Sequence, residues 1–330
     1  MPTSAWGGGA GTRGYHCLVP TTIVLAWPRG YCAGVERAVD TVERALRIYG
    51  PPVYVRKQIV HNIHVVRDLE AKGAVFVEEE TEAPPGSVLI LSAHGVAPPV
   101  YANAAELGLS VIDATCPLVT KVHLEARRFA RDGYTILLIG HQGHEEVVGT
   151  SGEAPGSVVL VGSPEEARAV QVPDPNRVAY LSQTTLSVDE TNEVIEALKD
   201  RFPSIEGPPR DDICYATQNR QEAVKDLASR SDVILVIGSD NSSNSRRLVE
   251  VAKSRGTPAY LIDDQTEIRL EWLEGRDVIG ITSGASAPEW LVERVVDHLK
   301  TLGATTVEQL HTVDERMVFS LPSGVRAPVG

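Results

Sequence analysis

Short apolar runs alternate with amphipathic segments about ten times along the 330 residues, and this alternation limits the folds open to the chain. A helix-length segment between two strands carries the chain back to the same end of a sheet, so successive strands pair in parallel. The sequence therefore predicts parallel α/β sheets. Three cysteines, Cys32, Cys116 and Cys214, each begin a block of roughly 80 to 100 residues, about the size of one small α/β unit. We expect three small parallel-sheet α/β units arranged with pseudo-threefold symmetry around a central site.

The expected units follow these cysteines along the chain. Ahead of them lies a Gly-rich stretch, GGGAGTRG, whose lack of periodicity is typical of a disordered tail. The predicted division is a tail at 1–20, α/β units at 21–116, 117–213 and 214–303, and a C-terminal closing segment at 304–330.

Composition excludes several classes of protein. The formal net charge of −13 argues against a nucleic-acid-binding protein, because phosphate contacts need a basic surface. Four cysteines are too few for a disulfide scaffold in a chain of this length. No segment resembles a signal peptide or a transmembrane span, so we expect a cytoplasmic protein that does not bind membranes.

The stretch VIDATCPLVTKVH places Cys116 between an apolar strand and a helix that Pro117 begins. Cys32 and Cys214 also precede predicted helices. Unpaired backbone N–H groups and the helix dipole favour a thiolate, or an anionic cluster, at such positions. Cys17 lies in the tail, which cannot hold a ligand in place. Three thiolates with a vacant fourth position fit either zinc with a water molecule or a cubane iron-sulfur cluster with one free iron, and the ligand count does not choose between them.

Histidines and hydroxyl-rich turns follow the predicted strands. His61, His94 and His144 stand at strand C-terminal ends, the edge where parallel sheets bind ligands. The turns that contain Ser242 and Ser286 precede helices, where backbone N–H groups can hold phosphate oxygens. Neither a Walker-type sequence nor a GxGxxG fingerprint is present, so nucleotide binding is not expected.

Nine motifs, in order, resemble those of the 4-hydroxy-3-methylbut-2-enyl diphosphate reductases, iron-sulfur oxidoreductases of non-mevalonate isoprenoid biosynthesis. The resemblance spans about residues 21–320. Two positions depart from the family pattern: Trp27 precedes Pro28, and Glu145 stands between His144 and Glu146 where proline is common. The motifs are PRGYCAG, IVHN, SAHGV, DATCPLVTKVH, GHQGHEE, QTTLS, DDICYATQNRQEA, GSDNSSNS and GASAP.

The resemblance implies a 4Fe-4S cluster with three cysteine ligands, Cys32, Cys116 and Cys214, and one open iron site. It implies that Glu146 delivers protons while two electrons pass through the cluster from a ferredoxin or flavodoxin. The reaction would be the reductive dehydroxylation of 4-hydroxy-3-methylbut-2-enyl diphosphate to isopentenyl diphosphate and dimethylallyl diphosphate. The implied substrate-binding residues are His61, His94, His144, Gln183, Thr184, Thr217, Ser242, Ser243, Asn244 and Ser286.

Two other hypotheses compete with this prediction. A zinc hydrolase with three cysteines and a water molecule would act on a phosphorylated small molecule, with Glu146 as the base. A non-enzymatic iron-sulfur sensor or carrier would have no use for the turns that can hold phosphate.

Overall fold

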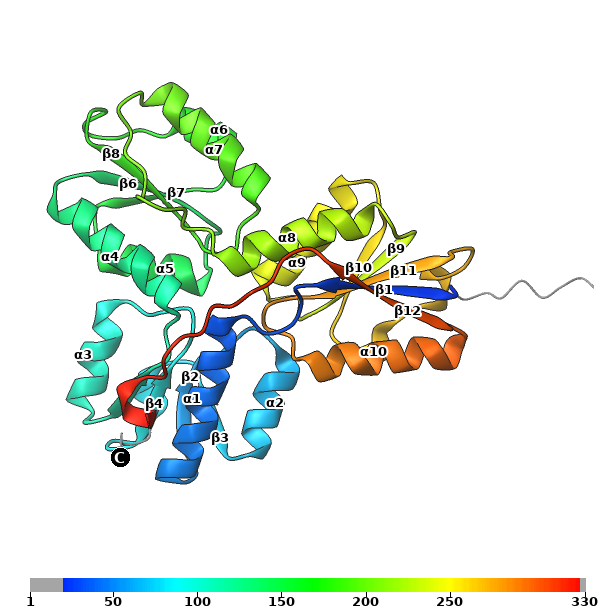
Figure 1. Ribbon diagram of the computed structural model, residues 1–330. Coiled ribbons are helices and arrows are strands. Elements are labelled where there is room, and N and C mark those ends of the chain that lie inside the picture. The colour runs from blue at the N-terminus through cyan, green and yellow to red at the C-terminus, as the bar shows by residue number, and fades with distance from the viewer. Residues whose placement is uncertain (1–19, 327–330) are drawn as a thin grey trace, which may run out of the picture.

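The computed structural model describes residues 20–326, which form three lobes, each with its own sheet (Figure 1). Every strand pair within the three sheets is parallel, which confirms the predicted α/β class. The sheets differ in size, with five, four and three strands. No helix within residues 20–326 is long and apolar enough to cross a membrane.

The first lobe holds a sheet in the order β3-β2-β4-β5. Apolar residues of α1 recur at helical spacing, and Val35, Ala38, Val42 and Ala45 bury one face of the helix against this sheet. Its strands are β2 (Val53–Arg56), β3 (Ala74–Val77), β4 (Val88–Leu91) and β5 (Ser110–Asp113), and its helices are α1 (Ala33–Tyr49), α2 (Ile63–Ala71) and α3 (Pro98–Glu106).

The second lobe holds a sheet in the order β7-β6-β8. Ser187 caps α7 by accepting a hydrogen bond from the Glu190 backbone N–H at 3.3 Å. The strands are β6 (Thr135–Ile139), β7 (Val158–Val161) and β8 (Val178–Ser182), and the helices are α4 (Pro117–Arg131), α5 (Glu145–Glu153), α6 (Pro164–Ala169) and α7 (Val188–Arg201).

The third lobe holds a sheet in the order β10-β9-β11-β1-β12. Apolar side chains of β9 and β11 are buried on both faces, because helices cover both sides of this sheet (Figure 1). The strands are β1 (Thr22–Trp27), β9 (Val233–Ile237), β10 (Ala259–Ile262), β11 (Val278–Ser283) and β12 (Thr306–His311), and the helices are α8 (Tyr215–Ala228), α9 (Ser243–Ser254) and α10 (Glu289–Leu302).

The first strand belongs to the third lobe, which corrects the expected unit at 21–116. β1 pairs with β11 and β12 rather than with the strands of the first lobe. Residues Ile23, Val24, Leu25 and Ala26 are buried on both faces, so this strand needs an interior place in a sheet. The position of β1 just before α1 in the sequence does not determine which sheet it joins. From β1 in the third lobe, the chain crosses to the first lobe through the loop that carries Cys32.

The C-terminal part divides between two lobes. β12 adds an edge strand to the third sheet, and residues 312–326, here called the C-terminal segment, then cross to the first lobe (Figure 1). The segment ends at the short 3-10 turn Ser323–Val325, where Val325 is buried in the first lobe's core. The expected closing segment at 304–330 is therefore a sheet strand followed by a crossing segment. The expected disordered tail, with Cys17, lies largely outside the described residues.

Candidate active site

A cavity that opens to solvent lies where the three lobes meet, and its empty space, including solvent at the opening, is about 750 Å³. Helix starts and strand ends from all three lobes form its wall. Among the lining residues are all of the predicted site residues except Gln183: Cys32, His61, His94, Cys116, His144, Glu146, Thr184, Cys214, Thr217, Ser242, Ser243, Asn244 and Ser286.

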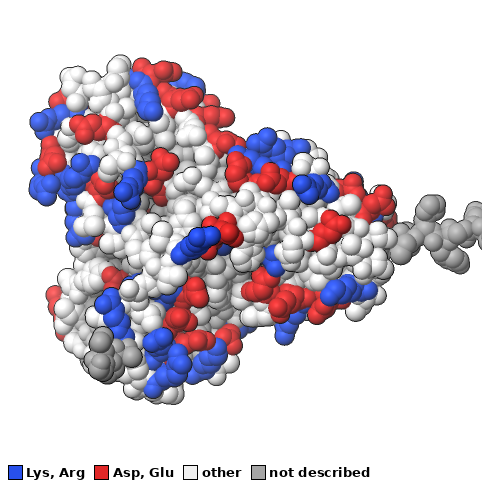
Figure 2. All heavy atoms as spheres, viewed as in Figure 1, with Lys and Arg blue, Asp and Glu red and all other residues white. Residues whose placement is uncertain are grey.

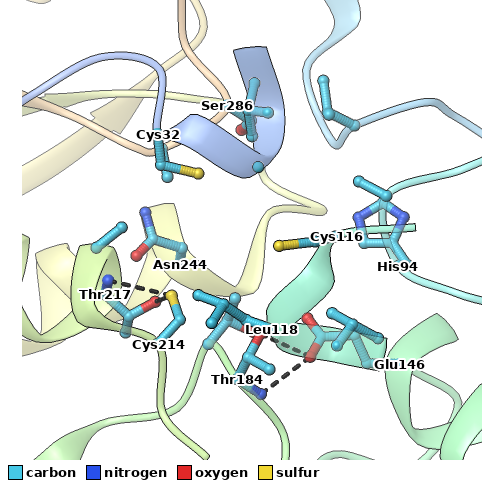
Figure 3. A pocket seen from close by; sticks show the side chains of 18 of the residues that line it. Cys32, His94, Cys116, Leu118, Glu146, Thr184, Cys214, Thr217, Asn244 and Ser286 are labelled. Atoms are coloured by element: carbon cyan, nitrogen blue, oxygen red, sulfur yellow. Dashed lines mark hydrogen bonds between the residues drawn. The ribbon is translucent and has the colours of Figure 1, made fainter. Parts of the chain in front are cut away.

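Each lobe contributes one cysteine to this cavity. Cys32, Cys116 and Cys214 are the N-cap residues of α1, α4 and α8, as the sequence predicts. Figure 3 shows the three sulfur atoms pointing into the same open space. No disulfide joins the cysteines of the described chain. The lobes therefore bring three free thiols to one place from positions far apart in the sequence.

The thiols of Cys116 and Cys214 are harder to ionise than the helix-start argument predicts. Burial, with nearby Cys32 as the next cause, raises the pKa of Cys116 to about 12. Burial likewise raises the pKa of Cys214 to about 11, again with Cys32 contributing. Hydrogen bonds from helix-start groups act in the opposite direction, as expected, but burial outweighs them. A bound metal group must therefore displace protons from these thiols.

Gly34 leaves room beside two of the sulfur atoms. A Cβ atom at this position would lie 2.7 Å from the Cys116 Sγ and 3.8 Å from the Cys32 Sγ. Any larger residue would therefore press on the Cys116 sulfur. Within residues 20–326, no three His, Cys, Asp or Glu side chains are arranged to hold one metal ion. The three cysteine side chains point into one open space (Figure 3).

Three histidines from two lobes form one group in the cavity. The His61 and His94 rings stack with centroids 4.0 Å apart, and His144 meets them edge-on at 5.6 and 6.1 Å. Burial lowers the pKa of His61 and of His144 to about 4, and it lowers the pKa of His94 well below its ordinary value. The free site thus holds neutral imidazoles, which can take up protons when an anion arrives.

Glu146 is the single carboxylate among the cavity-lining residues. Its side chain is 4% exposed, and its Oε2 accepts hydrogen bonds from the Thr184 backbone N–H at 2.9 Å and from the Thr184 Oγ1 at 2.8 Å (Figure 3). Burial raises the pKa of this carboxyl, although the bonds from Thr184 oppose the shift. A carboxyl whose pKa is raised toward neutrality suits proton donation.

The neighbouring carboxylate, Glu145, has a different environment. It is the first residue of α5, and its Oε1 lies 4.0 Å from the Lys57 Nζ. Glu145 does not line the cavity. The departure from the family's proline therefore adds a charge outside the site. Trp27 likewise lies outside, where its ring stacks on His311 with centroids 6.4 Å apart.

Hydroxyl and amide groups complete the wall. Ser242 caps α9, and the Ser286 Oγ donates to the His61 backbone oxygen at 2.8 Å, so it links the third lobe to the first. Asn244 is 4% exposed, and neither atom of its side-chain amide has a hydrogen-bond partner within the described chain. Such a buried amide needs a partner. A ligand in the cavity would supply one.

Gln183 is buried but does not line the cavity. Its Oε1 accepts from the His141 backbone N–H at 3.2 Å, and its Nε2 donates to the Thr185 Oγ1 at 2.8 Å and the Ser243 Oγ at 3.3 Å. These bonds place Gln183 behind Thr185 and Ser243. The structure thus supports a role in positioning the wall, rather than the predicted direct contact with a substrate.

Sequence reasoning did not find the lining residue Phe319 of the C-terminal segment. The apolar residues of RMVFSLP are the only signal at this position, and they do not reveal that Phe319 lines one cavity with residues that lie about 30 to 290 positions earlier. Leu118 and Val119 of α4 also line the cavity. Their place in the first turn after Cys116 could have revealed them.

The chain matches the family model described as LytB protein over residues 23–300. It is 64% identical over 305 residues to the 4-hydroxy-3-methylbut-2-enyl diphosphate reductase of Acidothermus cellulolyticus, a match that covers 92% of this chain and 90% of that protein. It is 57% identical over 330 residues to the protein of the same name from Mycolicibacterium paratuberculosis, with 99% of each covered.

Two solved structures are similar to the whole three-lobed arrangement. The E-1-hydroxy-2-methyl-but-2-enyl-4-diphosphate reductase from Plasmodium falciparum superposes with a TM-score of 0.90 at 38% identity, covering 93% of this chain and 97% of that chain. A second structure, of (E)-4-hydroxy-3-methyl-but-2-enyl diphosphate reductase, has a TM-score of 0.61 at 34% identity and covers 85% of this chain and 99% of that chain.

Proposed function

The chain belongs to the LytB protein family, and we propose that Cys32, Cys116 and Cys214 hold its iron-sulfur cluster as a 4Fe-4S group with one iron free of protein ligands. The activity is the reduction of 4-hydroxy-3-methylbut-2-enyl diphosphate, the terminal step of the non-mevalonate pathway. Two electrons and two protons remove the hydroxyl group as water and yield isopentenyl diphosphate or dimethylallyl diphosphate.

One observation carries the cofactor assignment: the N-cap cysteines of three helices, one from each lobe, line a single cavity. Gly34 keeps the space beside two of the sulfurs free of side-chain atoms. These residues fit the cluster. When bound, it supplies electrons and a Lewis-acidic iron beside the substrate.

Glu146 supplies one of the two protons that the reaction consumes. Its raised pKa keeps a proton available on the carboxyl, and burial excludes water that would compete for it. The Thr184 Oγ1, at 2.8 Å from the Glu146 Oε2, fixes the orientation of the carboxyl and can pass a proton between it and a substrate hydroxyl. Both groups face the space into which the cysteines point (Figure 3).

The diphosphate is bound without a lysine or arginine among the lining residues. His61, His94 and His144 become its charged partners by taking up protons, while the first turn of α9 directs backbone N–H groups toward it. The unpartnered amide of Asn244 supplies a further donor at the same helix start. This arrangement fits a chain whose net charge is −13, since the anion is held by local groups.

An anaerobic assay with 4-hydroxy-3-methylbut-2-enyl diphosphate and a chemical reductant tests the proposal. We expect isopentenyl and dimethylallyl diphosphate to form only when the reductant is present. A zinc hydrolase would instead release phosphate without a reductant. An iron-sulfur sensor or carrier would not bind the prenyl diphosphate. Either of these results would refute the assignment.

We further propose that the enzyme works in the cytoplasm, because cluster-binding thiols need a reducing compartment. A small electron-carrier protein of the ferredoxin or flavodoxin type would deliver the electrons.

A further inference from the structure

The wall between the cavity and the outside is one residue thick at two places. Cys116 lines the cavity, while Thr115 and Pro117, its neighbours on either side, line a recess on the outer surface. Phe319 also lines the cavity, and the preceding residue, Val318, is 83% exposed. At both places a chain segment has cavity on one side and solvent on the other.

Arg37 shows that these two places adjoin. Its Nε donates to the Ser320 backbone oxygen at 2.8 Å, and its Nη1 donates to the Thr115 backbone oxygen at 3.0 Å. Arg37 also lines the outer recess. One arginine thus joins the C-terminal segment to the loop before Cys116, so both thin parts of the wall belong to one face of the molecule.

Apolar side chains are exposed on this face. Met317 is 49% exposed, Val318 83% and Leu124, beside the recess, 55%. We call the face made by these three residues and the recess the strap face. Figure 2 shows mainly uncharged surface in the middle of this side, where the C-terminal segment crosses between lobes, apart from one adjoining pair of blue and red groups; most charged side chains gather toward the outer parts of the lobes.

The strap face is less acidic than the rest of the chain. Arg37 and Arg326 bond only to backbone oxygens within the described residues, so no carboxylate neutralises them by direct pairing. The cations at the strap face are Arg37, Lys121, Arg316 and Arg326, and the carboxylates that are not fully buried are Asp113, Glu125, Asp314 and Glu315. A chain with a net charge of −13 therefore presents here a face whose charges nearly balance.

We propose that the electron-carrier protein docks on the strap face, as an acidic one-electron carrier whose redox group lies near its own surface. The inference rests on the proposed function, which requires electrons to reach the cluster that Cys116 helps to hold. Electron transfer slows steeply with distance, so the thinnest wall is the favoured route. The uncharged centre and the unpaired arginines suit a partner that is itself acidic.

The stoichiometry requires repeated, short-lived contacts. Each turnover breaks one C–O bond, forms one C–H bond and releases water, which consumes two electrons and two protons. A carrier that gives one electron per encounter must dock twice and leave twice. Redox encounters of this kind bury less than about 1,200 Å². A small apolar centre with a few surrounding charges fits that requirement.

Two reductants separate docking from chemistry. The Val318→Glu variant should raise the KM for a reduced ferredoxin or flavodoxin about tenfold or more, because it places a carboxylate at the centre of the contact. Turnover driven by dithionite-reduced methyl viologen, which needs no protein contact, should stay within about twofold of wild type, and iron content should not change. Leu270→Glu is the matched control: Leu270 is 55% exposed but lies on the third lobe, and neither rate should change.

The outcomes are distinct. An unchanged KM for the carrier in Val318→Glu would overturn the docking proposal. An equal loss of the carrier-driven and viologen-driven rates would also overturn it, because Val318 would then support the cavity wall instead of the contact with the carrier. Absence of viologen-driven turnover in the wild-type enzyme would instead overturn the proposed function. Increased salt should raise the wild-type KM for the carrier without affecting the viologen-driven rate.

Discussion

Two adjacent carboxylates at the start of α5 differ because one faces the cavity and the other does not. Glu146 is 4% exposed and accepts two hydrogen bonds from Thr184, whereas Glu145 lies beside Lys57. The sequence assigned the proton donor to Glu146 only because Glu146 matches the carboxylate of a family motif. Glu145 departs from that motif, since it stands where proline is common. The different surroundings support that assignment with a physical reason, since only Glu146 is buried beside the thiols.

Glu146→Gln should therefore retain the cluster but lower the turnover rate by about 10²-fold or more, the usual contribution of a general acid. The amide keeps the size and hydrogen bonding of the side chain but cannot donate an acidic proton. Iron content and the viologen-driven rate, measured on the same preparation, check this prediction. Glu145→Gln is the matched control and should stay within a few fold of wild type. Wild-type turnover by Glu146→Gln would refute the proposed role.

The histidine group predicts how stability depends on pH. The pKa values of His61 and His144 are lowered to about 4 in the folded protein, from an ordinary value of 6.5. Between these values the unfolded chain binds more protons than the native one, so the free energy of unfolding falls as the pH falls from 6.5 toward 4. Each such histidine contributes up to about 1.4 kcal/mol per pH unit.

Urea denaturation of the cluster-free protein at pH 7 and at pH 5.5 measures this effect. We expect the midpoint to be lower at pH 5.5, and the His61→Asn variant to show a smaller decrease. Equal midpoints for the wild type at the two pH values would contradict the view that these imidazoles are held neutral.

At the scale of elements, features that depend on local sequence were predictable. Cys32 and Cys116 each precede a helix because a strand, a turn and an amphipathic segment follow one another there, whereas the helix after Cys214 follows α7 and a loop. The start of α7 at Ser187 has a similarly local cause, the side-chain cap. The raised pKa values of Cys116 and Cys214 were not predictable. Helix-start groups do lower the pKa of Cys116, but burial among residues from three lobes raises it further, and burial depends on tertiary packing.

Features that depend on distant partners could not be predicted. The sequence TIVLAW indicates a buried strand, but nothing in it reveals that β1 pairs with β11 and β12. Phe319 reaches the cavity only because the C-terminal segment crosses between lobes. Gln183 lies in a motif that lines the site, yet its side chain points to Ser243 and Thr185. In each case a contact over a long sequence separation decides the outcome.

A buried ion pair holds the C-terminal segment in place. Arg220 is fully buried, and its Nη1 donates to the Glu315 Oε1 at 3.0 Å, while its Nη2 donates to the Gly30 backbone oxygen at 2.7 Å. Gly30 lies two residues before Cys32, and Arg220 is on the same helix that Cys214 caps. One guanidinium therefore joins the C-terminal segment to two cysteine-bearing elements.

Glu315→Gln should lower the free energy of unfolding by about 3 kcal/mol, because it leaves the buried Arg220 charge without its carboxylate. Amide hydrogens of residues 312–326 should also exchange faster, which hydrogen-exchange mass spectrometry would show. Arg316→Gln removes a neighbouring charge that is 88% exposed and should change stability by less than about 0.5 kcal/mol. Similar effects of the two variants would show that the ion pair does not hold the segment.

At the scale of the whole molecule, three parallel sheets of different size place one N-cap cysteine each at a common centre. The sequence predicted α/β units with a cysteine at the start of a helix in each, but it placed β1 with the first unit instead of the third. The centre is closed by links between lobes, such as Ser286 to the backbone oxygen of His61. Because the cluster ligands come from all three lobes, cluster binding should stabilise the contacts between the lobes.

The central claim is that three cysteines, one from each lobe, bind a 4Fe-4S cluster. Iron and sulfide content of the anaerobically purified protein tests it most directly, with Cys214→Ser and Cys17→Ser as matched variants. We predict about four irons and four sulfides per chain in the wild type and in Cys17→Ser, and a marked loss in Cys214→Ser. A colourless wild-type protein with one zinc per chain, or iron loss in Cys17→Ser with retention in Cys214→Ser, would contradict the account.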